Sequence, residues 1–528
     1  MTEHVAIIGA GIGGLTSAAL LAARGFRVTV LEKEDWVGGK ARQIEIDGVP
    51  VAGGPTVFTM RDVFDDVFAE CGSALDDHVR IETAQVIARH AWDSSGTLDL
   101  FADSERSEEA IGDFAGAAEA AAYRSFRAEA KRIYEVLDDP FLRGDSASTP
   151  LPMMWRMGPW RIHDQLAMRP FDNLWKAIGG HFKDPRLQQL FGRYSTYCGS
   201  DPFQSPATLM LIAHSEAKGV WLIDGGIHAL GKALAELARK CGARIRTGAR
   251  VAQILTDNAK VSGVRLTNGD VIHADMVISN ADPAALAHGK FGEGPSKSVA
   301  RMPDAKRSLS ALVWFAHAKT EGFDLQHHNV FFSSDYAREF REIASGQPPS
   351  EPTVYLCAQD RGASHASVNH DAATPFVAGR RERIQMIVNA PANGDTHTYS
   401  SEEIERCNTG LRRTLRRCGL ELEEPMPHHL ATPQEWERLF PATGGALYGR
   451  ASHGWAASFL RQGPRTKIPG LYCTGGATHP AAGVPMAALS GQLAAKTICA
   501  DRASTRKFHQ AATPGGISTP SAKTGSTA

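Results

Sequence analysis

The sequence predicts an α/β protein in which one parallel sheet is assembled from three separate stretches of the chain. Three observations predict this class. An apolar strand at residues 4–8 runs directly into a glycine-rich turn, the turn opens an Ala/Leu-rich helix, and similar strand and helix patterns return near 225–285 and 471–496. We expect the long insertions between these stretches to form a mixed α+β domain and a helical region.

The glycine-rich turn follows the first strand without a gap and reads Gly9-Ala10-Gly11-Ile12-Gly13-Gly14. Gly9 suits a tight turn, Gly11 leaves room for a pyrophosphate beside the backbone, and Gly14 lets the helix pack closely on the strand. The helix that follows offers free N–H groups and the positive end of its dipole to phosphates. These features predict a split Rossmann-like nucleotide-binding domain.

A second strand at residues 28–31 ends on Glu32. A carboxylate at this position can accept hydrogen bonds from both hydroxyls of a ribose, and its charge disfavours a 2′-phosphate. Because the strand, turn, helix, second strand and acid occur in register, they favour a bound dinucleotide over a glycine turn without a ligand.

Composition excludes several other classes. The 528 residues include 57 basic and 58 acidic side chains, so nucleic acid is not an expected partner. Eight cysteines are scattered without metal-ligand spacing, which indicates reduced thiols. The first strand leaves no room for a signal peptide, and the uncharged stretch 468–495 contains three prolines that would break a membrane-spanning helix. We therefore expect a cytoplasmic protein without a transmembrane helix.

The remaining elements follow from periodicity and turn residues. Helices are expected at 63–70, 115–137, 227–241 and 486–495, hairpins at Asp47-Gly48 and Asn268-Gly269, and strands at 243–246, 251–255, 276–278, 354–356, 384–388 and 471–473. The resulting division is a nucleotide-binding domain at 1–75, 221–290 and 461–503, a helical region at 76–220, a substrate domain at 291–460 and a disordered tail at 504–528.

The segment 149–175 differs from its surroundings because methionine and tryptophan side chains interleave with arginines. Trp155 and Trp160 are suited to enter the edge of a bilayer while the arginines meet lipid headgroups. The alternative is a lid packed on the substrate domain. We favour peripheral contact with a membrane surface.

With these motifs in view, the chain resembles the FAD-dependent carotenoid desaturases of the phytoene desaturase type, within the amine-oxidase-like flavoprotein fold. The resemblance runs from residue 5 to about residue 495. It rests on the first glycine motif and on five further ones: Gly38-Gly39-Lys40-Ala41-Arg42, Gly54-Pro55-Thr56, Asp224-Gly225-Gly226, Ser279-Asn280-Ala281-Asp282 and Gly475-Gly476-Ala477-Thr478-His479-Pro480.

The resemblance implies FAD as the cofactor and assigns residues to it. Gly39, Lys40 and Arg42 would line the pyrophosphate and ribose, and Gly54, Pro55 and Thr56 belong to the same site. The backbone of Val251 would hold the adenine. Gly476 and the run Val484, Pro485 and Met486 would lie along the isoalloxazine ring.

Within this family, the stretches 59–68, 191–197, 219–221 and 444–450 are more similar to hydroxyneurosporene and methoxyneurosporene dehydrogenases. This similarity implies introduction of the 3,4 double bond into 1-hydroxy or 1-methoxy acyclic carotenoids, with oxygen or a membrane quinone as the electron acceptor. Three alternatives stay open: a phytoene- or neurosporene-type desaturase, an amine oxidase of the same fold, and a non-catalytic prenyl-binding protein.

Candidate chemistry beyond the cofactor rests on few residues. His479 is the best candidate for tuning the flavin or accepting a proton, against the alternative of a loop histidine bound to backbone. Arg193, Tyr194 and Tyr197 offer polar ends to a hydroxylated substrate, although ordinary packing explains them equally well. The pairs His327-His328 and His428-His429 do not predict a metal site, because adjacent side chains on a strand face opposite ways.

Overall fold

The computed structural model describes residues 2–94, 96–144, 169, 171–362 and 379–510, and the side chains of all of these except 505–510. Trp155 and Trp160 lie outside the described residues, as does most of the segment 149–175. Among the described residues, no helix is long and apolar enough to cross a membrane.

A five-stranded sheet lies at the centre of the molecule, and every neighbouring pair of its strands is parallel. Its strands come from the three stretches that the sequence predicted to join. In spatial order they are β21 (Leu471–Cys473), β13 (Met276–Ser279), β1 (His4–Ile8), β2 (Arg27–Leu31) and β9 (Arg244–Arg246).

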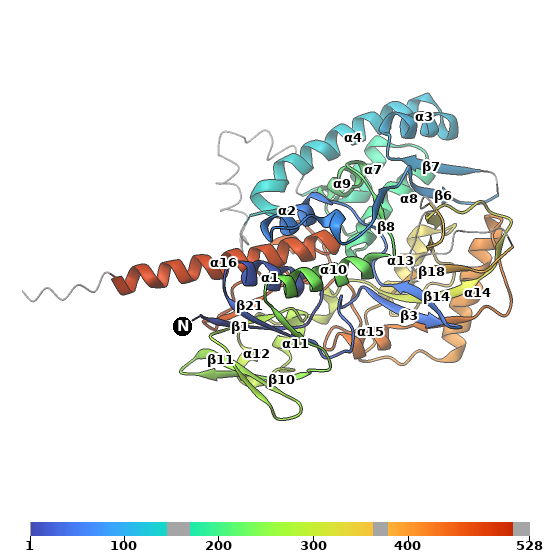
Figure 1. Ribbon diagram of the computed structural model, residues 1–528. Helices are drawn as coiled ribbons and strands as arrows, with labels where there is room; N and C mark the ends of the chain where they lie inside the picture. The colour runs from blue at the N-terminus through green and yellow to red at the C-terminus, as the bar shows by residue number, and fades with distance from the viewer. Residues whose placement is uncertain (1, 95, 145–168, 170, 363–378, 511–528) are drawn as a thin grey trace, which may run out of the picture.

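Strand β1 is apolar throughout because both faces of this sheet are covered. Val5 and Ile7 pack in the cluster formed with three helices, whereas Ala6 and Ile8 pack against a small antiparallel sheet. Figure 1 shows the helices gathered on one side and the small sheet on the other. The helices are α1 (Ile12–Ala23), α10 (Ile227–Lys240) and α16 (Val484–Gln510), and the small sheet has strands β10 (Val251–Asp257), β11 (Lys260–Leu266) and β12 (Val271–His273).

Helix α16 is longer than the sequence predicted. The disordered tail expected from residue 504 is wrong up to Gln510, because the helix continues to that residue and its end extends beyond the sheet in Figure 1. Three contacts hold this extension: Asp501 accepts hydrogen bonds from Tyr472 at 3.0 Å and from Arg465 at 2.8 Å, and Arg502 forms an ion pair with Glu3. Residues 511–528 lie outside the described part of the chain.

The second large sheet has seven strands, and all its neighbouring pairs are antiparallel except β16 with β6. In spatial order they are β20 (His428–Ala431), β14 (Ser310–Ala318), β18 (Glu382–Ala390), β17 (Val354–Ala358), β16 (His328–Phe331), β6 (Val86–Ala91) and β7 (Thr97–Phe101).

Alternation along β18 gives this sheet two different faces. Ile384, Met386 and Val388 pack in the apolar cluster that includes helix α14 (Ser401–Arg417). Gln385 and Ile387 point to the opposite face and line a cavity. The sheet therefore forms one wall of that cavity.

Helices of the 62–217 region lie at the top of Figure 1, and the short turn among them at Arg193–Cys198 contributes Arg193 and Tyr197 to the cavity wall. Phe126, Phe182 and Phe191 form the buried aromatic centre of the helices, with ring centroids 4.7–5.4 Å apart. These helices are α2 (Asp62–Glu70), α3 (Ser104–Ala115), α4 (Ala117–Leu137), α7 (Leu174–His181), α8 (Pro185–Gly192) and α9 (Leu211–Ala217).

The other elements connect these parts. The hairpin predicted at Asp47-Gly48 is present, and it packs against β14. Its strands are β3 (Arg42–Ile46) and β4 (Val49–Gly53); the rest are β5 (Ile81–Thr83), β8 (Trp221–Ile223), β15 (Thr320–Glu321), β19 (Glu421–Leu422), α11 (Pro283–Ala287), α12 (Glu293–Ser296), α13 (Tyr336–Ala344) and α15 (Pro433–Leu439).

Candidate functional site

One cavity of about 520 Å³ joins the parallel sheet to the seven-stranded sheet. Such a volume lies in the range of ligand-binding pockets. One side of its wall is the backbone around the glycine turn after β1, and the other side is built from polar and aromatic side chains, among them Arg193, Tyr197, Tyr336 and Tyr355.

The backbones of the glycine turn and of Gly54 form a bare wall in which close neighbours leave little space for a Cβ. A Cβ built on Gly11 lies 2.8 Å from Asn280 Nδ2, and a Cβ on Gly14 lies 2.3 Å from the carbonyl oxygen of Gly9. Gly54 has a φ of 94°, and its Cβ would lie 1.9 Å from the carbonyl oxygen of Lys40. The close packing predicted for Gly14 is therefore present.

Helix α1 points its N-terminus into this wall. Its N-cap is Gly11, which has no side chain to bind the free N–H groups of the first turn. Because Gly9, Gly11 and Gly13 line the cavity, these donors and the positive end of the helix dipole are available to an anion. This arrangement fits the pyrophosphate of a dinucleotide.

Glu32 is a buried carboxylate in the same wall, with 6% of its surface exposed. It accepts hydrogen bonds from the backbone N–H of Ala10 at 2.6 Å and of Glu34 at 3.0 Å. Burial raises its pKa, and the two backbone donors oppose that shift. A carboxylate has about four lone-pair sites, so it retains acceptors for ribose hydroxyls.

Most residues predicted to bind the cofactor line the cavity. Lys40 lies beside Asp282 there; its ammonium donates to the carbonyl oxygen of Leu447, and burial lowers its pKa to about 8. The predicted residues on the wall are Gly9, Gly11, Gly13, Glu32, Gly39, Lys40, Gly54, Pro55, Thr56, Val251, Gly476 and Val484.

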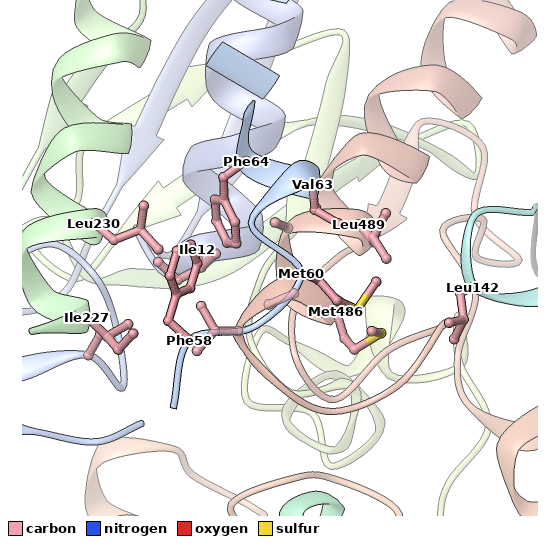
Figure 2. Close-up of a cluster of buried hydrophobic side chains, with 14 of the residues drawn as sticks. Ile12, Phe58, Met60, Val63, Phe64, Leu142, Ile227, Leu230, Met486 and Leu489 are labelled. Atoms are coloured by element: carbon pink, nitrogen blue, oxygen red, sulfur yellow. The ribbon is translucent and has the colours of Figure 1, made fainter. Parts of the chain in front are cut away.

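Four residues assigned to the cofactor site lie away from the wall. Gly14 packs against the carbonyl oxygen of Gly9. Arg42 points to α15, where it pairs with Glu435 at 2.7 Å and lies over the ring of Trp436. Pro485 and Met486 are buried in the first turn of α16, and Figure 2 shows Met486 beside Met60 in the apolar cluster. The family motifs place these residues near the site in the chain, but the side chains of Arg42, Pro485 and Met486 contact neighbouring helices and apolar residues and do not line the cavity.

His479 does not lie on the cavity wall either. It is 2% exposed, its Nε2 lies 3.2 Å from the carbonyl oxygen of Gly144, and its ring meets Phe141 edge-on. This placement matches the alternative of a loop histidine bound to backbone. A catalytic role for His479 has no support from this geometry.

Arg193, Tyr194 and Tyr197 lie together at the end of α8. The guanidinium of Arg193 is 5.2 Å from the ring centre of Tyr197 and 5.5 Å from that of Tyr355. Tyr197 donates to buried Glu216 at 2.9 Å, and Tyr194 donates to the other oxygen of the same carboxylate. Arg193 and Tyr197 line the cavity, whereas Tyr194 lies behind them.

Several wall residues had no role assigned from the sequence. Asn280 and Asp282 stand in a recognised motif, but only the fold brings Asn280 against Gly11. Gln385 could have been recognised from the sequence, because it is a polar residue inside an otherwise apolar strand. Tyr336 and Tyr355 gave no local signal: Tyr336 begins helix α13, and the position of Tyr355 depends on pairing across the large sheet.

The expectation that His327 and His328 face opposite ways is wrong. Their rings lie against each other with centroids 4.6 Å apart. Strand β16 begins at His328, so the alternation of a strand does not extend to His327. The side chains of His428 and His429 have different partners: His428 hydrogen-bonds the carbonyl oxygen of Met426, and His429 hydrogen-bonds Glu435.

The family model for flavin-containing amine oxidoreductases matches residues 12–499. The chain belongs to this family. A hydroxyneurosporene desaturase from Rubrivivax gelatinosus is 47% identical over 99% of this chain and 98% of its own. A phytoene desaturase from Neurospora crassa is 29% identical over 93% of this chain and 84% of its own.

Solved structures share the fold at low sequence identity. An oxidoreductase from Methanosarcina mazei superposes with a TM-score of 0.56 and 17% identity, covering 94% of this chain and 100% of its own. This flavoenzyme therefore has the amine-oxidase-like architecture, and FAD is its cofactor. The bare glycine wall, the uncapped N-terminus of α1 and buried Glu32 fit that cofactor.

Proposed function

We propose that this flavoenzyme desaturates acyclic carotenoids and introduces the C3–C4 double bond into substrates with a 1-hydroxy or 1-methoxy group. One observation carries the proposal: a single cavity runs from the glycine wall to the polar group of Arg193, Tyr197 and Tyr355. The 47% identity to a hydroxyneurosporene desaturase supports the same substrate class.

When bound, FAD supplies the acceptor for the hydride that leaves the carbon–carbon single bond together with a proton. The protein holds a long apolar chain in place and keeps water away from the reacting bond. Val313, Ile387 and Trp436 provide apolar surface on the cavity wall for this purpose.

The polar group supplies the recognition that an apolar tunnel lacks. An apolar pocket discriminates weakly between chains that differ by a small group, whereas a site that hydrogen-bonds a hydroxyl rejects the analogue without it. Among the described residues Arg193 has no ion-pair partner; it forms a hydrogen bond with Tyr197, and its remaining donors are available to a substrate oxygen. Leaving these donors unpaired with a plain carotene costs free energy.

We expect the purified holoenzyme to convert 1-hydroxyneurosporene at least about tenfold more efficiently than neurosporene or phytoene, because only the first substrate pairs with the polar group. The red shift of the polyene absorption on desaturation measures the rate. Efficient conversion of phytoene with no reaction on the hydroxylated substrate would point instead to a phytoene-type desaturase.

We also propose that the enzyme works at a membrane surface, with oxygen or a membrane quinone as the electron acceptor. Its substrate class resides in lipid. Phe171 and Trp455 are 78% and 46% exposed, and their rings meet edge-on with centroids 5.7 Å apart. Phe171 belongs to the Met/Trp/Arg segment that contains Trp155 and Trp160, so these exposed rings support an apolar contact there.

Replacing Phe171 and Trp455 together by serine is expected to move the protein from the liposome fraction to the supernatant in a flotation assay, because two membrane anchors are lost. The pair Trp155→Ser and Trp160→Ser is expected to act alike. Val271→Ser is a control, since this exposed valine lies in the small sheet at β12. Unchanged partitioning of both double variants would contradict membrane contact through this segment.

A further inference from the structure

Three side chains with ligand atoms for soft metals meet between β16 and β17. A ring nitrogen of His327, a ring nitrogen of His328 and Cys357 Sγ all lie within 4.8 Å of one another. None of the three lines the cavity described above, and the flavin reaction does not use them.

The pairing of the two strands explains this convergence. His328 and Cys357 are directly opposite each other in the antiparallel register, so their side chains emerge on the same face. His327 precedes the strand and turns onto that face. His328 and Cys357 are each 2% exposed, whereas His327 is only partly buried and provides a route from solvent.

The hydrogen bonds orient both imidazoles. His327 Nδ1 lies 2.8 Å from the carbonyl oxygen of Arg361, which can only accept, so this nitrogen carries the proton. His327 Nε2 is therefore unprotonated and carries a lone pair, and this nitrogen lies 3.4 Å from Cys357 Sγ. His328 Nδ1 lies 2.7 Å from the hydroxyl of Tyr355, which in turn lies 2.6 Å from Thr56 Oγ1. Outer partners of this kind typically fix metal-binding histidines.

The three side chains cannot satisfy one another's hydrogen-bonding groups. The Cys357 thiol can satisfy only one neighbouring lone pair, and His328 Nε2 is buried without a hydrogen-bond partner. An unpaired polar atom in the interior is costly. A cation bound by the two imidazoles and the thiolate satisfies all three groups together.

We propose that His327, His328 and Cys357 bind a thiophilic d¹⁰ cation, Cu⁺ or Zn²⁺. On binding, the thiol proton passes to solvent and a metal–sulfur bond forms, with no change of oxidation state. Thiolate and imidazole ligands select these ions over Mg²⁺ or Ca²⁺. Cu⁺ with one thiolate and two neutral imidazoles has no net charge, which suits a buried site.

The test is metal analysis of full-length flavoprotein purified without a polyhistidine tag and incubated with Zn²⁺ or, anaerobically, with Cu⁺. We expect stoichiometric metal after removal of excess ion, and the ion that remains bound distinguishes the two. Cys357→Ser and His328→Phe are expected to lose it. Cys407→Ser, which alters a buried cysteine of α14, is expected to retain it.

Replacement of the native ion by Co²⁺ tests the ligands directly, because a cobalt–thiolate bond gives a charge-transfer band in the near ultraviolet. We expect this band in the wild-type protein and in Cys407→Ser but not in Cys357→Ser. Bound flavin, followed by its visible absorption, shows whether each variant is folded. A wild-type protein that binds neither ion, or a folded Cys357→Ser variant that retains the metal, would overturn the proposal.

Discussion

Gly11→Val is expected to produce a folded protein without FAD, with affinity reduced by at least about a hundredfold, or roughly 2.7 kcal/mol. The wall at Gly11 is tight, since a Cβ lies 2.8 Å from Asn280 Nδ2 and the Asn280 side chain must shift to admit it. The two further methyl groups of valine extend from the N-cap of α1, where the pyrophosphate must approach the free N–H groups. The flavin absorption of purified protein, relative to protein concentration, measures the loss.

Gly180→Ala is the matched control, because this glycine of α7 has nothing within 4 Å of the added Cβ and no positive φ. We expect it to retain FAD at the wild-type level. Circular dichroism distinguishes loss of cofactor from loss of fold. Stoichiometric flavin in Gly11→Val would contradict the assignment of this wall to the pyrophosphate.

The nucleotide half of the site could be predicted from the sequence because its signals are local. The residues of β1, the glycine turn, α1 and Glu32 are contiguous or separated by one helix. Gly9 has the positive φ of the predicted turn, and Gly14 shows the predicted close packing. Strand β21 was predicted at its observed bounds, since an apolar triplet lies between a proline-glycine pair and a glycine-rich loop. Backbone conformation at such positions depends little on distant contacts.

The substrate half could not be predicted in the same way, because its geometry depends on pairing between distant strands. Tyr355 reaches the cavity only through the register of β17 with β16 and β18. The wrong interpretation of His327 and His328 has the same origin, since the start of β16 decides whether their side chains alternate. Arg42 follows a family motif, yet Glu435, nearly four hundred residues later in the chain, pairs with its side chain.

Arg193→Met is expected to lower kcat/KM for 1-hydroxyneurosporene by roughly 10- to 100-fold, because a hydrogen bond from a charged donor contributes about 1.5–3 kcal/mol. Methionine keeps an unbranched side chain but removes every donor. Arg186→Met is the matched control, since this arginine of the preceding helix α8 pairs with Asp184 at 2.6 Å and does not line the cavity. We expect the control to retain wild-type kcat/KM.

The decisive readout is the ratio of kcat/KM for the hydroxylated and unhydroxylated substrates, because a general loss of packing lowers both. We expect Arg193→Met to bring that ratio toward one. Neurosporene has no oxygen that binds Arg193, so the substitution removes no hydrogen bond from that substrate. Glu216→Gln is expected to have a smaller effect in the same direction. The amide keeps one acceptor oxygen but loses the charge that orders Tyr194 and Tyr197 beside Arg193. If Arg193→Met lowers both rates equally while flavin content is unchanged, Arg193 supports the shape of the cavity, and hydroxyl recognition must reside elsewhere on its wall.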